Sequence, residues 1–160
     1  MRMSNGVYRG WVPMMKKKIL LACSNGGHYV QLSLLASAFA DHEVVWAVSG
    51  NKALQAGSDG YRLIDANKQT PVRLVALACQ VLKILARERP DIVVSTGAAP
   101  GLFAVVFGRM LGARTVWIDS IANSARLSLS GRIARHFASE TLTQWQHLET
   151  PRVRYWGGVI

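Results

Sequence analysis

The amino-acid sequence predicts one α/β domain with a doubly wound, mostly parallel sheet covered by helices on both faces. Short apolar runs, typical of strands buried on both faces, alternate with segments of helical periodicity. Turns rich in Gly, Ser or Pro separate the two kinds of segment. The length of 160 residues, 50% of them hydrophobic, suits a single domain with a sizeable core.

The expected elements follow one another along the chain. Apolar and β-branched residues predict strands at 18–23, 43–48, 61–64, 92–95, 115–119, 140–143 and 153–156. Apolar residues at helical spacing predict helices at 28–39, 72–87, 100–111 and 130–138. Pro90 ends the second helix, and Pro100 suits the first turn of the third. These elements form one domain over residues 16–160, preceded by a loose N-terminal arm, residues 1–15.

The chain is strongly basic, with 19 Lys and Arg against 9 Asp and Glu and a formal net charge of +10. Residues 1–18 contain basic side chains and no acidic one, so the arm is basic as well. Such an excess favours an anionic partner, whether nucleic acid, anionic lipid or a phosphorylated substrate. The alternative is a basic surface that is merely solvated.

We expect neither a signal peptide nor a transmembrane helix. The N-terminus lacks an uninterrupted apolar stretch. Residues 101–113 are apolar, but Arg109 interrupts them and they fall short of the ~20 residues that span a bilayer. Cys23 and Cys79 lie in apolar patterns, which predicts small buried hydrophobes of a reducing cytoplasm rather than a disulfide.

The loop after the first expected strand reads Ser24-Asn25-Gly26-Gly27-His28. Two glycines let the backbone turn sharply and approach a ligand closely. The unpaired N–H groups of the helix that follows favour an anion. The spacing does not match the G-x-G-x-x-G dinucleotide fingerprint. A turn that only needs glycine remains the alternative.

His28 stands at the start of this helix. A helix N-terminus disfavours the imidazolium, so the side chain is expected to be neutral at physiological pH. A neutral imidazole can take a proton from a hydroxyl nucleophile. A histidine that simply caps or packs is the alternative.

A second loop runs from Ser95 through Thr96 and Gly97 to Gly101, where small residues again bring the backbone close to a cleft. The helix that follows is apolar except for Arg109. It is either a buried core helix or the source of an exposed patch that dips into a membrane interface. The patch would comprise Phe103, Phe107 and Met110.

The helix at 72–87 is also compatible with either a core helix or a helix at a membrane surface. Its polar residues fall within a narrow arc on an otherwise apolar surface: Arg73, Gln80, Lys83 and Arg87. A narrow basic stripe suits a helix shared between the core and a lipid surface. It also suits a covered helix whose few charges reach out to solvent.

The third loop, residues 119–131, begins with Asp119 at the end of a strand and is rich in serine. Ser128 or Ser130 can cap a helix whose first turns carry Arg132. Hydroxyls, a helix N-terminus and arginine make an oxyanion or sugar site. The alternative is a solvated loop.

Taken together, several short segments carry a resemblance. They are Cys23-Ser-Asn-Gly-Gly-His28, Ser95-Thr-Gly97, Trp117-Ile-Asp-Ser120, Leu127-Ser-Leu-Ser-Gly-Arg132, Gln144-Trp145 and Tyr155-Trp-Gly157. The chain resembles the asparagine-linked glycosylation 14 family and its bacterial relatives of the PssD type from about residue 17 to its end. The stretch 117–145 is the most specific part, and the Gly-Gly-His loop is shared with MurG-like glycosyltransferases.

The resemblance implies a Rossmann-like domain equivalent to the N-terminal half of a GT-B glycosyltransferase. Such a domain binds a polyprenyl-diphosphate-linked saccharide acceptor, and a separate catalytic subunit binds the UDP-sugar donor. The length of 160 residues agrees with one lobe and no donor domain. The donor is expected to be UDP-N-acetylglucosamine or UDP-glucuronic acid. Neither a cofactor nor a metal is expected.

The resemblance also assigns roles at the three loops. The acceptor diphosphate would lie on Gly26 and Gly27, with His28 as the base. Asp119 is a second catalytic candidate, with a shorter reach than the Glu that relatives often have there. The remaining substrate-binding candidates are Ser24, Asn25, Ser95, Thr96, Gly97, Ser120, Ser128, Ser130 and Arg132.

Eukaryotic members carry a membrane helix, whereas this chain has only its basic arm and its interfacial helices. The resemblance therefore implies peripheral attachment to the inner face of the cytoplasmic membrane, and no nucleic-acid partner. Two other classes remain open. One is a non-catalytic anchor for the catalytic subunit, and the other is a nucleotide-binding α/β module.

Overall fold

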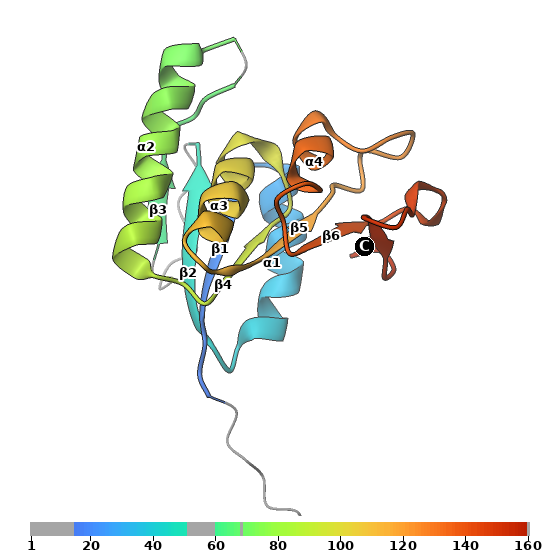
Figure 1. The fold of residues 1–160 in the computed structure, drawn as a ribbon, viewed down its shortest axis with the longest axis horizontal. Coiled ribbons are helices and arrows are strands. Elements are labelled where there is room, and N and C mark those ends of the chain that lie inside the picture. The colour runs from blue at the N-terminus through green and yellow to red at the C-terminus, as the bar shows by residue number, and fades with distance from the viewer. Residues whose placement is uncertain (1–14, 51–59, 68, 160) are drawn as a thin grey trace, which may run out of the picture.

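A computed structural model describes residues 15–50, 60–67 and 69–159. It contains one seven-stranded sheet in the order β3-β2-β1-β4-β5-β6-β7 (Figure 1). Every neighbouring pair of these strands is parallel. The predicted fold class is confirmed, and the named strands are entirely rather than mostly parallel. The expected basic arm lies outside the described residues apart from Met15, which is exposed.

The strands are β1 (Lys18–Ser24), β2 (Glu43–Ser49), β3 (Gly60–Leu63), β4 (Ile92–Ser95), β5 (Arg114–Ile118), β6 (Glu140–Thr143) and β7 (Arg154–Tyr155). The α-helices are α1 (Gly27–Ala36), α2 (Pro71–Glu88), α3 (Ala98–Met110) and α4 (Leu129–Ala134). Short 3-10 helices are η1 (Ser37–Phe39) and η2 (Gln146–Leu148). The expected helix at 28–39 is thus α1 continued by η1, and the expected helix at 130–138 is shorter.

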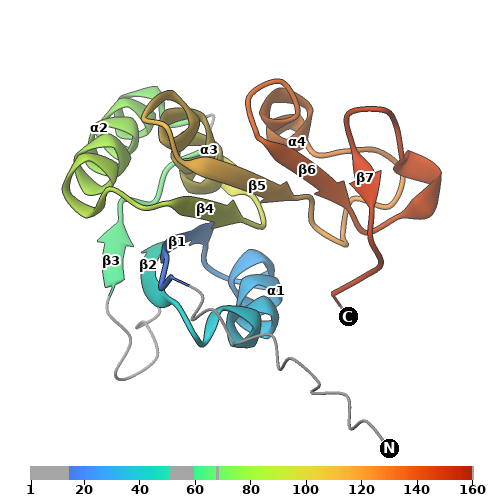
Figure 2. The ribbon, with the colours of Figure 1, turned by 60° about the horizontal axis from the view of Figure 1, so that its bottom comes forward.

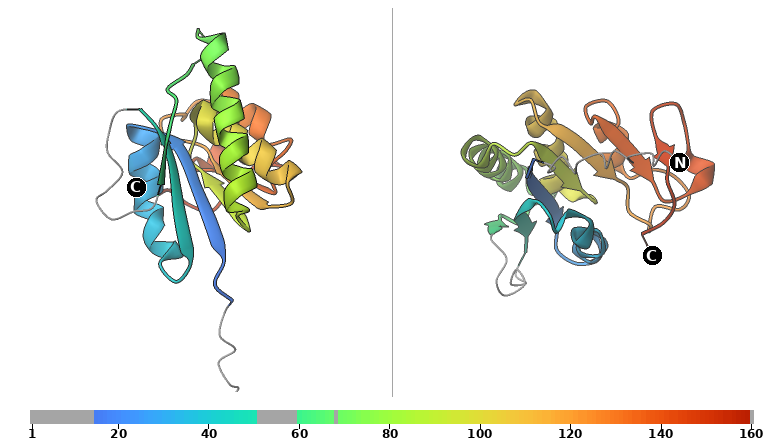
Figure 3. Two further views of the ribbon diagram at one scale, coloured as in Figure 1. Left: turned by 90° about the vertical axis from the view of Figure 1, so that its left-hand side faces the viewer. Right: turned by 90° about the horizontal axis from the view of Figure 1, so that it is seen from below.

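The helices lie on both faces of the sheet. Figures 2 and 3 show α1 on one face and α2, α3 and α4 on the other. Strand β1 pairs with β2 on one side and with β4 on the other, so the strand order reverses there. The chain leaving β1 enters α1, whereas the chain leaving β4 enters α3 on the opposite face. Ligands of open α/β sheets bind at such a reversal, beyond the carboxyl ends of the strands.

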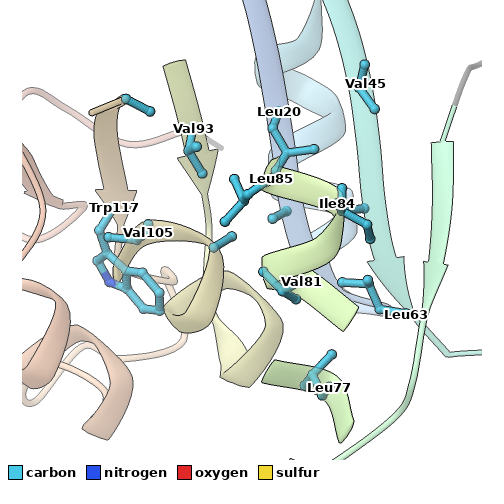
Figure 4. Close-up of a cluster of buried hydrophobic side chains, with 14 of the residues drawn as sticks. Leu20, Val45, Leu63, Leu77, Val81, Ile84, Leu85, Val93, Val105 and Trp117 are labelled. Carbon is cyan, nitrogen blue, oxygen red and sulfur yellow. The ribbon is translucent and has the colours of Figure 1, made fainter. Parts of the chain in front are cut away.

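Two apolar clusters explain why β1 is a continuous apolar run. Leu20 and Ala22 face the larger cluster, which fills the space between the sheet and helices α2 and α3 (Figure 4). Ile19, Leu21 and Cys23 face the second cluster, beneath α1. Strand side chains alternate between faces, so a strand covered on both sides needs an apolar residue at every position.

Helix α2 combines a buried face with exposed apolar residues. It buries Leu77 and Val81, while Val72 and Val75 are 81% and 66% exposed. Cys79 is exposed on it, so the prediction of two buried cysteines is wrong for Cys79 and confirmed for Cys23. The reason is that α2 carries more apolar residues than the sheet can cover.

Helix α3 is mainly a core helix. Phe103 and Phe107 are partly buried against the larger cluster and stack with ring centroids 5.8 Å apart. Met110, at the end of the helix, is 76% exposed. Within the described residues, no helix is both long and apolar enough to span a membrane.

Candidate functional site

The loop after β1 turns sharply at Gly26 and enters α1. Gly26 has φ +86°, a left-handed conformation that favours glycine. Its N–H donates to Asn25 Oδ1 at 2.8 Å, and the Asn25 N–H donates to the Ser49 carbonyl at 3.0 Å. A Cβ placed on Gly26 or Gly27 would meet no heavy atom within 4 Å. The outer side of this turn is therefore open.

The imidazole of His28 joins the loop after β1 to the loop after β4. His28 Nδ1 lies 3.3 Å from Ser24 Oγ, and Thr96 Oγ1 donates to the His28 carbonyl at 2.7 Å. A Cβ on Gly97 would overlap the ring at Cδ2 and Nε2. Gly97 also has φ +144°, so both conformation and space require glycine. The structure thus brings together Ser24, His28, Thr96 and Gly97.

The environment of His28 holds the ring neutral. Burial lowers the pKa of His28 below its ordinary value, and the negative charge of Asp119 opposes this shift. At neutral pH the imidazole can therefore accept a proton. Nδ1 of the ring lies beside the hydroxyl of Ser24, which can fix the tautomer.

Two helix N-termini point toward this edge of the sheet without a side-chain cap. The N-cap residues of α1 and α3 are Gly26 and Gly97, and neither helix has an acidic residue in its first turn. The positive ends of both helices are therefore not neutralised by a side chain of their own helix. An anion at this edge would meet backbone N–H groups and a favourable dipole.

Ser95 and Thr96 are fully buried, and Gly97 beside them is buried as well. Ser95 Oγ accepts from the Gly97 N–H at 3.1 Å, and a Cβ on Gly101 would overlap the same Oγ. The hydroxyls of Ser95 and Thr96 are thus engaged inside the protein, where they shape the loop after β4.

Asp119 is 2% exposed and organises the third loop from inside. Its Oδ1 accepts from the Trp117 indole N–H at 3.1 Å and from Ser128 Oγ at 2.6 Å, and its Oδ2 accepts from the Ser128 N–H at 2.9 Å. Ser128 Oγ in turn caps α4 by accepting from the Gly131 N–H at 2.8 Å. A Cβ on Gly131 would overlap Asp119 Oδ1. Asp119 and Ser128 therefore fix the start of α4.

The other predicted residues of this loop lie apart from His28's immediate contacts. Ser120 is 6% exposed, and its hydroxyl accepts from Gln31 Nε2 at 2.9 Å. Ser130 is half-buried and Arg132 is exposed. The outer part of the loop is held by Trp145, whose indole N–H donates to the Ile121 carbonyl at 2.8 Å.

Sequence reasoning missed Gln31 as a residue of this edge. It lies in α1 and is 4% exposed, and it contacts Ser120, which is 89 positions away along the chain. The only local signal was an amide among apolar residues of a short helix. That signal does not reveal which distant group the amide meets.

The sheet order and the helices on both faces (Figure 2) define a doubly wound, Rossmann-like α/β domain. The chain superposes on MurG from Acinetobacter baumannii with a TM-score of 0.72 and 13% identity, covering 88% of this chain and 45% of that protein. It also superposes on a UDP-N-acetylglucosamine 2-epimerase from Rickettsia bellii with a TM-score of 0.68 and 14% identity, covering 90% and 45%. At these identities the likeness shows the fold alone.

The family follows from sequence. Residues 63–159, more than half of the chain, match the family described as "Oligosaccharide biosynthesis protein Alg14 like", and the chain belongs to this family. The predicted resemblance is confirmed. Two relatives named "UDP-N-acetylglucosamine transferase subunit ALG14" match at 31% identity: one from Yarrowia lipolytica over 87 residues and one from Eremothecium gossypii over 100. These matches cover 49% and 54% of this chain and 40% and 45% of the relatives, less than half of their length.

Proposed function

We propose that this chain is the acceptor-binding subunit of a two-component glycosyltransferase. The complex would move a sugar from a UDP-sugar to a polyprenyl-diphosphate-linked saccharide. The observation that carries the proposal is a half-buried histidine at the strand-order reversal, between two helix N-termini whose N-cap residues are glycines. Membership of the Alg14-like family and relatives named as UDP-N-acetylglucosamine transferase subunits support it.

The acceptor diphosphate would bind at the turn before α1. Gly26 and Gly27 leave open space on the outer side of the turn. Helix α1 has no side-chain cap and no acid in its first turn, so its N–H groups can receive an anion. The walls of this diphosphate site would be shaped by Ser24, Asn25 and the loop at Ser95, Thr96 and Gly97.

His28 would serve as the general base. If Nδ1 carries the proton and donates it to Ser24 Oγ, the lone pair of Nε2 is free. The acceptor hydroxyl oxygen then attacks the anomeric carbon of the donor, the bond from that carbon to the UDP oxygen breaks, and Nε2 takes the hydroxyl proton. Direct displacement of this kind inverts the anomeric centre.

Asp119 would influence the reaction through the neighbouring groups that it positions. Its oxygens accept hydrogen bonds from Trp117 and Ser128, so we propose that it positions the loop and adjusts the charge near His28. Ser120 and Ser128 belong to the same internal framework. Of the predicted residues of this region, Ser130 and Arg132 are less enclosed, and we propose that they meet acceptor or partner.

A separate catalytic subunit would supply the donor site. The structural superpositions cover only 45% of the MurG and epimerase chains. We propose that this chain corresponds to the N-terminal, acceptor-side half and that the partner binds UDP-N-acetylglucosamine or UDP-glucuronic acid. The complex would lie at the inner face of the cytoplasmic membrane, where α2 presents Val72 and Val75 beside Arg73.

The test is reconstitution of transfer with a donor-binding partner. Transfer of sugar to a polyprenyl-diphosphate saccharide should require both chains. His28→Ala should lower the transfer rate by at least ~100-fold, in the range that general-base catalysis contributes. The same variant should still co-purify with the partner.

Three outcomes would contradict the proposal. Undiminished transfer by His28→Ala would favour the non-catalytic anchor, in which the partner holds all reacting groups. Transfer by the partner alone at the rate of the complex would remove the chain from the reaction. Tight nucleotide binding by the isolated chain would favour the nucleotide-binding module instead.

A further inference from the structure

Two buried glutamines lie behind the candidate site. Gln31 belongs to α1, and Gln144 directly follows β6; they are 4% and 6% exposed. Gln144 Nε2 donates to Gln31 Oε1 at 2.7 Å, although the two residues are 113 positions apart along the chain. A buried pair of primary amides is stable only when each polar atom has partners.

Gln31 reaches both the first turn of α1 and the loop after β5. Its Nε2 donates to the Gly27 carbonyl at 3.2 Å and to Ser120 Oγ at 2.9 Å. Its Oε1 accepts from the Ile121 N–H at 3.1 Å in addition to Gln144. Since a backbone carbonyl only accepts and a backbone N–H only donates, these partners fix the orientation of the amide.

Gln144 extends the network to the end of the described chain. Its Nε2 donates to the Asp119 carbonyl at 3.0 Å as well as to Gln31. Its Oε1 accepts from the Val159 N–H at 2.9 Å. The backbone partners again fix the orientation of the amide, so neither glutamine can turn over without losing hydrogen bonds.

The network therefore forms a continuous path through the protein. It starts at the Val159 N–H, passes through the amides of Gln144 and Gln31, and ends at the Gly27 carbonyl, next to His28. Along the way it holds the loop after β5 through Asp119 and Ser120. The central hydrogen bond between the two glutamines is buried and the two end bonds are part-buried, so the loss of one partner leaves another enclosed polar atom unpaired.

We infer that Gln31 and Gln144 are positioning residues that couple the segment at Val159 to the turn of α1 that carries His28. Among the described residues, neither glutamine makes a hydrogen bond to the ring of His28. They fix where the first turn of α1 lies relative to the loops after β5 and β6. The inference rests on the proposed function only in treating His28 as the base.

Amide hydrogen exchange in the full chain tests the coupling without requiring transfer activity. The reporter is the Val30 N–H, which donates to the Gly26 carbonyl at 3.0 Å in the first turn of α1. Gln144→Leu and Val159→Pro should each accelerate its exchange by roughly tenfold, because both remove a step of the path. Val159→Pro removes the N–H that donates to Gln144 Oε1, and its ring also fixes φ at this position.

Val159→Ala is the matched control, because it shortens the same side chain and keeps the N–H. Its exchange at Val30 should match the wild type, and amides of β1 such as Leu20 should be unchanged in all variants. Unchanged exchange at Val30 in both Gln144→Leu and Val159→Pro would overturn the inference. Equal acceleration in Val159→Pro and Val159→Ala would overturn it too, because the N–H would then not carry the effect.

Kinetics of the reconstituted complex separate this inference from the proposed function. Gln31→Leu should lower kcat by at least tenfold and also raise the KM for the acceptor, because the displaced turn carries both the base and Gly27 of the diphosphate site. Faster exchange at Val30 with unchanged kcat would support the coupling and count against His28 as the base.

Discussion

The ionisation of His28 is decided by residues around it. Burial of the imidazole disfavours the charged form and lowers its pKa, while the carboxylate of Asp119 favours the charged form and partly opposes this. Asp119 is itself buried, so its charge acts with little screening by solvent. One carboxylate thus both fixes the third loop and raises the proton affinity of the candidate base against the larger effect of burial.

The pH dependence of transfer follows from this arrangement. A general base works in its neutral form, so kcat/KM of the reconstituted complex should fall as the pH drops through the pKa of His28. Because that pKa is lowered, the midpoint should lie below the ~6.5 of an ordinary histidine. Asp119→Asn removes the charge that raises the pKa, so it should move the midpoint to still lower pH.

Ser128→Ala serves as the control for this measurement. It breaks the hydrogen bond from Ser128 Oγ to Asp119 Oδ1 but keeps the carboxylate. Its midpoint should stay closer to the wild type than that of Asp119→Asn. A midpoint of Asp119→Asn above the wild-type value would contradict the electrostatic role given to Asp119.

Residue types at the site were predictable, whereas most of their contacts were not. Glycines after a strand and a histidine at a helix start are local patterns, and they pointed to Gly26 and His28. The close approach of Gly97 to the His28 ring depends on how β1 and β4 pair, which no local pattern contains. The same holds for Gln31, whose partners come from loops far along the chain.

At the scale of elements, long buried strands and helices were predicted well. The apolar run of β1 and the periodic face of α2 each reflect burial, which the sequence records directly. Edges were less predictable: β7 has two residues where four were expected, and η2 was missed. Short edge elements depend on single contacts rather than on a periodic pattern.

Helix α3 begins with a strained residue. Ala98 has φ +65°, a left-handed conformation that costs an alanine roughly 1 kcal/mol. Ala98→Gly relieves this cost, so it should raise the free energy of unfolding by about 0.5–1 kcal/mol in chemical denaturation. Because Ala98 adjoins Gly97, the strain lies at the helix start that faces the candidate site.

Ala99→Gly is the matched control for this prediction. Ala99 follows Ala98 in α3, has no positive φ and packs partly against the core. The same change of side chain there should lower the free energy of unfolding by about 1 kcal/mol. Equal effects of the two substitutions would show that the conformation of Ala98 carries no strain.

At the scale of the whole molecule, the two faces of the sheet are covered unequally. Helix α1 covers one face, whereas α2, α3 and α4 cover the other (Figure 3). The composition predicted the basic character of the molecule and an anionic partner. It could not predict that the most exposed valines gather at the start of α2, because helix periodicity alone does not say which apolar residues the core has room for.

Binding to anionic vesicles tests the membrane part of the proposed function. Val72→Asp together with Val75→Asp should lower co-sedimentation with phosphatidylglycerol vesicles by roughly tenfold or more, since two exposed apolar side chains are lost and two negative charges gained. Val30→Asp is the control, because Val30 is 54% exposed on α1, across the sheet. Equal binding of all variants would remove α2 from the membrane contact.

The contact between Gly97 and the ring of His28 also matters for protein engineering. The two positions share one volume, so an imidazole at one leaves room only for hydrogen at the other. A loop after β4 transplanted from another protein would fit here only if its residue at this point were glycine. Exchange of the loop after β1 or the loop after β4 must therefore keep these two positions compatible, although the chain encodes the loops 72 residues apart, from Asn25 to Gly97.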